Sequence, residues 1–286
     1  MRASQQGLAA LILGAVAIGF APIFVRLSEV GPVATGFHRL FWSLPLFALL
    51  TLLNTRPRPS SGQWRVMAAS GAFFAGDMIV WHLGILLTSV ANASLFTNMA
   101  PLFVALALWV IWGKRPSARF AVALAVTVAG AVALVGGAVE MSLQRLAGDG
   151  LSLLSGLFYA GYILAVGRAR EGLPTPLLMA VGGAVAAGLI LVAALALGEP
   201  VWPHTLRGWS VVLGLALVSQ CAGQGLIAWG LAHVPVRFGA LVLLLQPLVA
   251  VLVAWALFDE TLGVIQILGA MVVLAGIHLA RRANPT

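Results

Sequence analysis

An acid and an imidazole lie in a stretch that is otherwise suited to the interior of a membrane. Residues 71–84 read GAFFAGDMIVWHLG, in which Asp77 and His82 can ionise. An ionisable side chain at the centre of a bilayer costs about 2.5–3.5 kcal/mol on insertion scales, so it indicates a functional site by default. A carboxyl group and an imidazole in this place could bind a solute or exchange a proton. Asp77 is the first candidate site residue.

Three interpretations of Asp77 stay open from the sequence. At ~1.5 Å per residue in a ~30 Å core, Asp77 and Arg39 lie at similar depths. The carboxylate could pair with Arg39 or with an amide, face a solute or proton path, or be protonated. Trp81 lies one turn from Asp77, whereas helix periodicity turns His82 to another side. His82 is either a hydrogen-bonded packing residue or a proton carrier.

Amides and aromatic rings extend this set of candidate binding residues. Gln220 and Gln224 are one turn apart, and their amides suit a neutral or zwitterionic solute, although such amides also join helices. Tyr159 and Tyr162 lie midway along an apolar run, away from the interfaces where aromatic belts form. Together with Trp81 and Trp229, they could form a slot for an apolar or aromatic side chain.

Two prolines lie in the middle of apolar runs. Pro101 follows Asn98 by three residues, and Pro247 follows Gln246 directly. A proline inside a helix lacks an N–H and clashes with the carbonyl four residues earlier. Bent helices at the membrane centre are common places for solute contacts in transporters, although a packed kink is the alternative. Asn98 and Gln246 are candidate binding residues, and Pro101 and Pro247 are candidate hinges.

The composition identifies the solvent of most of the chain as lipid. Of the 286 residues, 61% are hydrophobic and 8% charged, against about 25% charged in ordinary soluble domains. The basic residues are scattered singly, which argues against nucleic acid as a partner. Cys221 is the single cysteine, and no His, Asp or Glu spacing suggests a metal. No phosphate-binding GxxxxGK[ST] motif occurs, so we expect no cofactor.

Apolar segments of about 20 residues predict an all-α polytopic protein with ten transmembrane helices. We expect the first run to be a retained span, because no convincing cleavage site follows it. Short connections make residues 1–286 a single transmembrane domain. The predicted spans are 7–27, 33–53, 64–88, 91–113, 118–138, 149–169, 174–197, 207–231, 236–258 and 262–281.

Basic residues predict the orientation of these spans. Most of them fall on the side of the N-terminus, and basic residues concentrate in cytoplasmic loops. Both termini are therefore expected in the cytoplasm. Arginine far outnumbers lysine, which hints at a bacterial source and hence at the inner membrane. The residues on the N-terminal side are Arg2, Arg56, Arg58, Arg65, Lys114, Arg115, Arg119, Arg168, Arg170, Arg237, Arg281 and Arg282.

The two halves of the chain resemble each other. At one constant offset Pro101 aligns with Pro247, and at a similar offset Gly19 aligns with Gly161, which makes both glycines candidate hinges. We therefore expect a first five-helix repeat at 1–143 and a second at 144–286. An odd number of spans per repeat inverts the second half. Inverted repeats around a central cavity are typical of secondary transporters with alternating access.

Two stretches resemble EamA-like proteins of the drug/metabolite transporter superfamily. Residues 243–279 are similar to the second-repeat signature of that family, with Pro247, Glu260, Gly269 and Gly276 at its marked positions. Residues 35–47, TGFHRLFWSLPLF, are similar to the second span, which has an arginine where Arg39 stands. One departure is Lys114, which the first repeat has at the place of Glu260.

This resemblance implies a ten-helix exporter with a cavity lined by spans 1–4 and 6–9 and with spans 5 and 10 at the periphery. Many characterised relatives move small metabolites outward, and the amino-acid exporter branch fits best. We therefore expect export of a neutral or aromatic amino acid by a monomer or weak homodimer. Carriers of nucleotide sugars or cationic drugs are the alternatives. A channel or an intramembrane enzyme is disfavoured, because filter signatures and catalytic motifs are missing.

Overall fold

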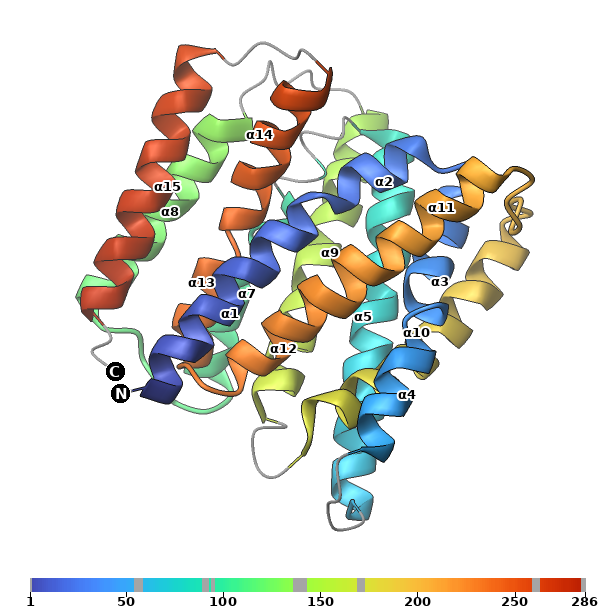
Figure 1. The fold of residues 1–286 in the computed structure, drawn as a ribbon. Coiled ribbons are helices and arrows are strands. Elements are labelled where there is room, and N and C mark those ends of the chain that lie inside the picture. Colours follow the sequence, from blue (N-terminus) through green and yellow to red (C-terminus); the bar gives the residue numbers. More distant parts are fainter. Residues whose placement is uncertain are drawn as a thin grey trace.

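The computed structural model describes residues 2–53, 59–88, 93, 96–135, 143–168, 173–258 and 263–283. Throughout these ranges the regular structure is helical, which confirms the predicted all-α class (Figure 1). Glu260, Arg56, Arg58 and Arg170 lie outside the described residues. The helices are α1 (Arg2–Gly19), α2 (Ala21–Leu27), α3 (Pro32–Phe41), α4 (Leu44–Leu52), α5 (Ser61–Leu87), α7 (Ala100–Val110), α8 (Ala118–Val135), α9 (Leu143–Arg168), α10 (Thr175–Ala196), α11 (Leu206–Gly214), η1 (Leu215–Gln224), α12 (Gly225–Leu231), α13 (Val236–Val242), α14 (Leu245–Phe258) and α15 (Val264–Ala283).

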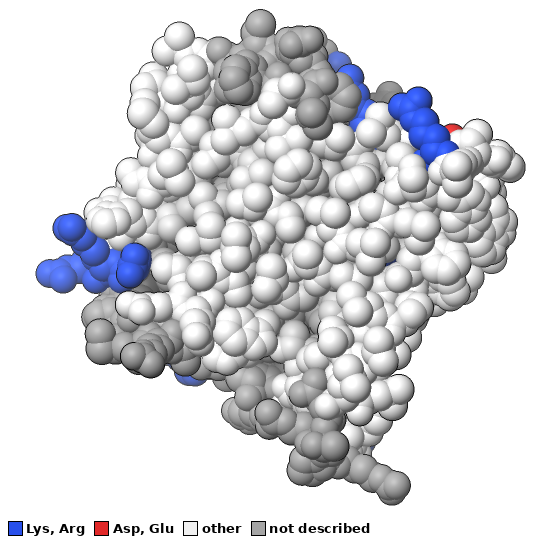
Figure 2. Space-filling model, viewed as in Figure 1, with Lys and Arg blue, Asp and Glu red and all other residues white. Residues whose placement is uncertain are grey.

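The helices follow the predicted spans. Seven are long and apolar enough to cross a membrane, and the predicted spans 91–113, 118–138 and 236–258 contain shorter apolar helices. In Figure 2 a broad surface without charged side chains separates basic residues at opposite ends of the molecule. Such a surface suits contact with lipid tails. The start of α1 and the end of α15 lie at the same end of the bundle (Figure 1).

Several spans are broken, and prolines stand at the breaks. Pro22 opens α2, Pro45 opens α4 and Pro101 opens α7, each within the first two helical positions. Proline is tolerated there because its missing N–H would have no partner in the first turn anyway. The ninth span likewise breaks between α13 and α14, just before Pro247. Two of these breaks lie next to Pro101 and Pro247, whose role as hinges stays a prediction.

The two candidate hinge glycines differ in their surroundings. Gly19 ends α1 at the break before α2, and a Cβ there would meet the side chain of Val249 on α14. Gly161 lies within the unbroken α9, where its missing side chain accommodates the ring of Phe73. The hinge role of both residues stays a prediction.

Helices α8 and α15, the fifth and tenth spans, pair at one side of the bundle (Figure 1). A Cβ on Gly130 would lie 2.6 Å from the backbone nitrogen of Val273, and Gly276 packs directly on Thr127. Small residues allow helix backbones in membranes to approach closely. The central cavity is thereby left to the remaining spans.

Two carboxylates tie the loops at the end of the molecule opposite the termini. Glu199 accepts hydrogen bonds from the backbone N–H groups of Val33 (3.3 Å) and Ala34 (2.8 Å) at the start of α3. Glu29 in turn accepts from the backbone N–H and hydroxyl of Thr205 at the start of α11. A carboxylate at a helix N-terminus is favourable because unpaired N–H groups and the helix dipole meet it there. The Thr205 hydrogen bond holds the pKa of Glu29 below its usual value.

The eighth span contains an unusual segment, because η1 between α11 and α12 is a π-helix over Leu215–Gln224. Most π-helical turns in proteins are single bulges, and they are frequent at functional sites. Sequence periodicity did not predict this segment. It contains both of the predicted glutamines.

Candidate functional site

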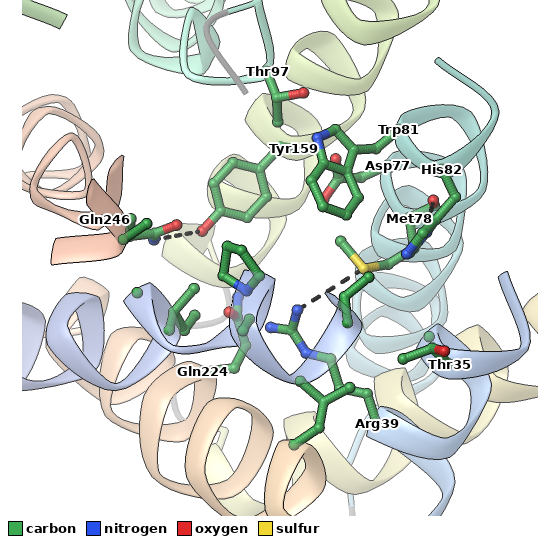
Figure 3. A pocket seen from close by; sticks show the side chains of 18 of the residues that line it. Thr35, Arg39, Asp77, Met78, Trp81, His82, Thr97, Tyr159, Gln224 and Gln246 are labelled. Atoms are coloured by element: carbon green, nitrogen blue, oxygen red, sulfur yellow. Dashed lines mark hydrogen bonds between the residues drawn. The ribbon is translucent and has the colours of Figure 1, made fainter. Parts of the chain in front are cut away.

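A cavity of about 130 Å³ lies in the centre of the bundle, which is room for several water molecules (Figure 3). Its walls come from spans 1, 2, 3, 4, 6, 8 and 9. The seventh span, which the family resemblance placed at the cavity, instead lines a second cavity of about 10 Å³. The predicted residues that line the main cavity are Gly19, Arg39, Asp77, Trp81, His82, Asn98, Tyr159, Gln224, Gln246 and Pro247.

Arg39 points from α3 into this cavity (Figure 3). Its side chain is 7% exposed, and its Nε donates to the amide oxygen of Gln220 at 3.0 Å. The guanidinium lies 5.5 Å from the ring centre of Phe74 and 4.0 Å from the sulfur of Met78. An amide, an aromatic face and a thioether stabilise the cation less than a carboxylate would. The guanidinium is therefore suited to bind an anionic group.

The hydrogen-bond partner of Asp77 is a hydroxyl, and neither Arg39 nor an amide. Its Oδ1 lies 2.5 Å from the hydroxyl of Ser155 on α9, and no hydrogen bond or ion pair joins the described side chains of Asp77 and Arg39. The Ser155 hydroxyl lies 3.0 Å from that of Thr97, and the Thr97 hydroxyl lies 3.2 Å from the backbone oxygen of Ser152. The Arg39–Asp77 pair, one of the interpretations left open by the sequence, is thus replaced by an arginine–amide pair and a carboxyl–hydroxyl chain.

His82 lines the cavity one turn beyond Met78. Its Nδ1 lies 2.6 Å from the backbone oxygen of Met78, so the neutral ring carries its hydrogen on Nδ1. The Nε2 atom is buried without a hydrogen-bond partner, which leaves a bare acceptor. The ring of Trp81 packs edge-on against His82, with 4.9 Å between the ring centres. Although helix periodicity turned His82 away from Asp77, both residues line the same cavity.

The opposite wall consists of amides and a tyrosine. The Nε2 of Gln246 donates to the hydroxyl of Tyr159 at 3.4 Å (Figure 3). The amide of Gln224 is buried, and no hydrogen bond of ordinary geometry reaches either of its polar atoms, although the hydroxyls of Tyr159 and Tyr162 lie near it. A buried amide without partners is costly. A solute or water in the cavity would supply them.

Three predicted binding residues lie away from the main cavity. Gln220 and Tyr162 line the small second cavity, where the Tyr162 hydroxyl lies 3.9 Å from the sulfur of Met179. Trp229 lines neither cavity, because its ring packs on His233 with 4.1 Å between the ring centres. Trp229 follows Gln224 by five residues through the regular α-helix α12, which turns it about 140° away from the face of Gln224. A role of Trp229 in binding stays a prediction.

Sequence reasoning missed several polar residues at the site. Ser155 and Thr97 were not singled out, because single hydroxyls in apolar runs are common and usually bond to their own helix. Outside the two cavities, His38 was also missed; it is fully buried, with Nε2 2.6 Å from the backbone oxygen of Val201 and Nδ1 accepting from the indole N–H of Trp42. Among the described residues, no group of three His, Cys, Asp or Glu side chains could hold a metal ion.

Comparisons with known proteins agree with this architecture. The EamA-like transporter family matches residues 5–136 and again residues 146–282. An uncharacterized transporter of Archaeoglobus fulgidus is 27% identical over 98% of both chains. An uncharacterized transporter of Synechocystis is 30% identical over 46% of this chain and 40% of its own length. One solved structure superposes with a TM-score of 0.80 and 18% identity over 98% of this chain and 97% of its own, which shows the shared fold.

Proposed function

The chain belongs to the EamA-like transporter family, and from this membership and the cavity we propose that it exports a neutral or aromatic amino acid by alternating access. The observation that carries the proposal is the division of the cavity into two ends. Donors of Arg39 and Gln224 face it from spans 2 and 8. Acceptors of Asp77 and His82 face it from span 3 (Figure 3).

The two ends of the cavity are complementary to a zwitterion. A guanidinium binds a carboxylate through charge-assisted hydrogen bonds, and the Gln224 amide adds a further donor. A carboxylate and a bare imidazole nitrogen accept hydrogen bonds from an ammonium group. The rings of Trp81 and Tyr159 line the cavity between them and suit an apolar or aromatic side chain.

The alternative solutes fit this arrangement less well. A nucleotide sugar carries two phosphates and would require several cationic side chains, whereas Arg39 is the single Lys or Arg that lines the cavity among the described residues. A cationic drug would meet Asp77 but also the positive charge of Arg39. The arrangement therefore favours a molecule with both charges over one with either charge alone.

Alternating access in this proposal rests on two inverted repeats, 1–143 and 144–286. Two successive matches to the family support the division, and the shared end of both termini is consistent with an even number of crossings (Figure 1). We place both termini in the cytoplasm of a bacterial cell, with the inner membrane as the site of action. We expect a monomer or weak homodimer.

Counterflow in proteoliposomes tests the proposal. Vesicles loaded with an unlabelled neutral amino acid should take up the labelled compound transiently and saturably, and empty vesicles should not. Arg39→Gln should raise the half-saturating concentration at least tenfold, since a charged hydrogen bond is worth about 1.5–3 kcal/mol. Exchange of a quaternary cation or a nucleotide sugar, with no exchange of amino acids, would refute it.

A further inference from the structure

The hydroxyl chain beside Asp77 has two complete hydrogen-bond arrangements. With an ionised Asp77, Ser155 donates to the carboxylate and Thr97 donates to Ser155. With a protonated Asp77, the acid donates to Ser155, Ser155 donates to Thr97, and Thr97 donates to the backbone oxygen of Ser152. Every hydroxyl hydrogen has an acceptor in both arrangements. The hydrogen bonds that link Asp77, Ser155 and Thr97 can therefore reverse their donor–acceptor direction without movement of any heavy atom.

The surroundings leave Asp77 able to change its protonation. Its side chain is 2% exposed within the whole protein but lines the central cavity, as does Thr97. The ionisable groups that face it are Arg39 on α3, His82 on α5, and Tyr159 and Tyr162 on α9. The Nε of Arg39 donates to Gln220, and no ion pair joins Arg39 to Asp77 among the described side chains. Among the described residues, the polar side chains that spans 8 and 9 present to this cavity are the neutral amides of Gln224 and Gln246.

The geometry points to Asp77, Ser155 and Thr97 as a proton-binding site that couples solute export to proton entry. One carboxyl group can hold either a proton or the ammonium group of a solute. When the proton binds, a bond forms between it and a carboxylate oxygen, and the ammonium loses its acceptor. When the solute binds, the proton returns to water in the cavity. Mutually exclusive occupancy of one site produces exchange, so the transporter is a proton antiporter.

Two measurements on proteoliposomes test the coupling, which rests on the proposed function. An imposed pH gradient should drive net movement of the amino acid through the wild-type protein, with a solute-dependent proton flux seen by a trapped pH dye. Asp77→Asn should lose both, because an amide neither binds nor releases a proton, and any counterflow that remains in this variant should be independent of pH. If wild-type counterflow is present but a pH gradient moves neither solute nor protons, the coupling is refuted and the proposed function stands.

Variants of the hydroxyl chain distinguish positioning from simple packing. Ser155→Ala removes a donor to the anion, so the midpoint of the pH profile of transport should move by about one pH unit toward alkaline values. Ser155→Thr retains a hydroxyl and should restore the profile. Ser70→Ala is the matched control, since the Ser70 hydroxyl donates to Met67 within the same helix as Asp77. A profile that is the same in the Ser155→Ala and Ser70→Ala variants would refute the assignment.

Infrared titration tests the site without any solute. The purified protein should show a protonated-carboxyl band that appears reversibly as the pH is lowered and is missing in Asp77→Asn. The band should change frequency in Ser155→Ala, because its hydrogen-bond partner is removed. A titrating carboxyl band that is identical in the folded wild-type protein and in Asp77→Asn would overturn the inference, even if no transported amino acid is found.

Discussion

Replacing Gln220 by leucine should destabilise the protein through Arg39. The Gln220 amide is 1% exposed and supplies the oxygen acceptor of the guanidinium Nε, at 3.0 Å. A hydrogen bond to a charged group contributes about 1.5–3 kcal/mol, and the buried donor left behind has no water to replace it. Leucine recovers part of this loss through apolar packing. We expect Gln220→Leu to lower the free energy of unfolding by about 1–3 kcal/mol.

Two further variants isolate the charge of the guanidinium. Gln220→Glu keeps an acceptor at the same place and adds a compensating charge, so its stability should stay within about 1 kcal/mol of the wild type. Gln266→Leu is the amide control, because Gln266 accepts only a neutral backbone N–H, from Gly263, at the start of α15. Denaturant titration in mixed micelles measures all three. If Gln220→Leu is no less stable than Gln266→Leu, Gln220 does not hold the buried guanidinium.

Three other predictions follow from packing, pH and the cavity walls. Gly130→Ala should lower stability by about 1–3 kcal/mol because its Cβ would meet the backbone of α15, whereas Gly150→Ala, with open space around it, should not destabilise; thermal melting in detergent compares them. The pKa of Glu29 lies below its usual 4.5, so its stabilising contribution is present above that pH and lost as the pH falls; unfolding of Glu29→Gln should depend less steeply on acid pH. Trp81→Ala should weaken solute binding by at least fivefold in counterflow competition, and Trp229→Ala should weaken it less, since Trp81 lines the cavity and Trp229 does not.

The fold could be predicted because lipid imposes strong constraints on sequence. Apolar runs of about 20 residues locate the spans, and prolines such as Pro101 and Pro247 locate the breaks. The starts of helices are also readable where side chains cap them. At α5, for example, Ser60 and Gln63 form reciprocal hydrogen bonds that define its first turn. These signals are local, so one sequence is enough to find them.

The details of the site were less predictable, because spans that are apolar on all sides carry little information about which side faces the interior. Asp77 and Arg39 were found as buried charges, but their true partners Ser155 and Gln220 depend on how the four helices α3, α5, α9 and η1 pack. Trp229 was expected at the cavity as an aromatic companion of Trp81 and the tyrosines, whereas its ring packs on His233. The loop residues Glu29 and Glu199 cap helices more than 160 residues away in sequence, and no local pattern indicates this pairing.

The π-helix η1 has a consequence for how the inner surface could change. Its hydrogen bonds span five residues in place of four, so each turn holds more residues than the α-helical turns of α11 and α12 on either side. Converting this segment into α-helix would change the number of residues per turn and so rotate the helix that follows it. Everything after Gln224 would rotate about the axis, and Trp229 would sweep round from its stack with His233. Such a rotation of one span would change which of its side chains contact the solute, without movement of the neighbouring spans.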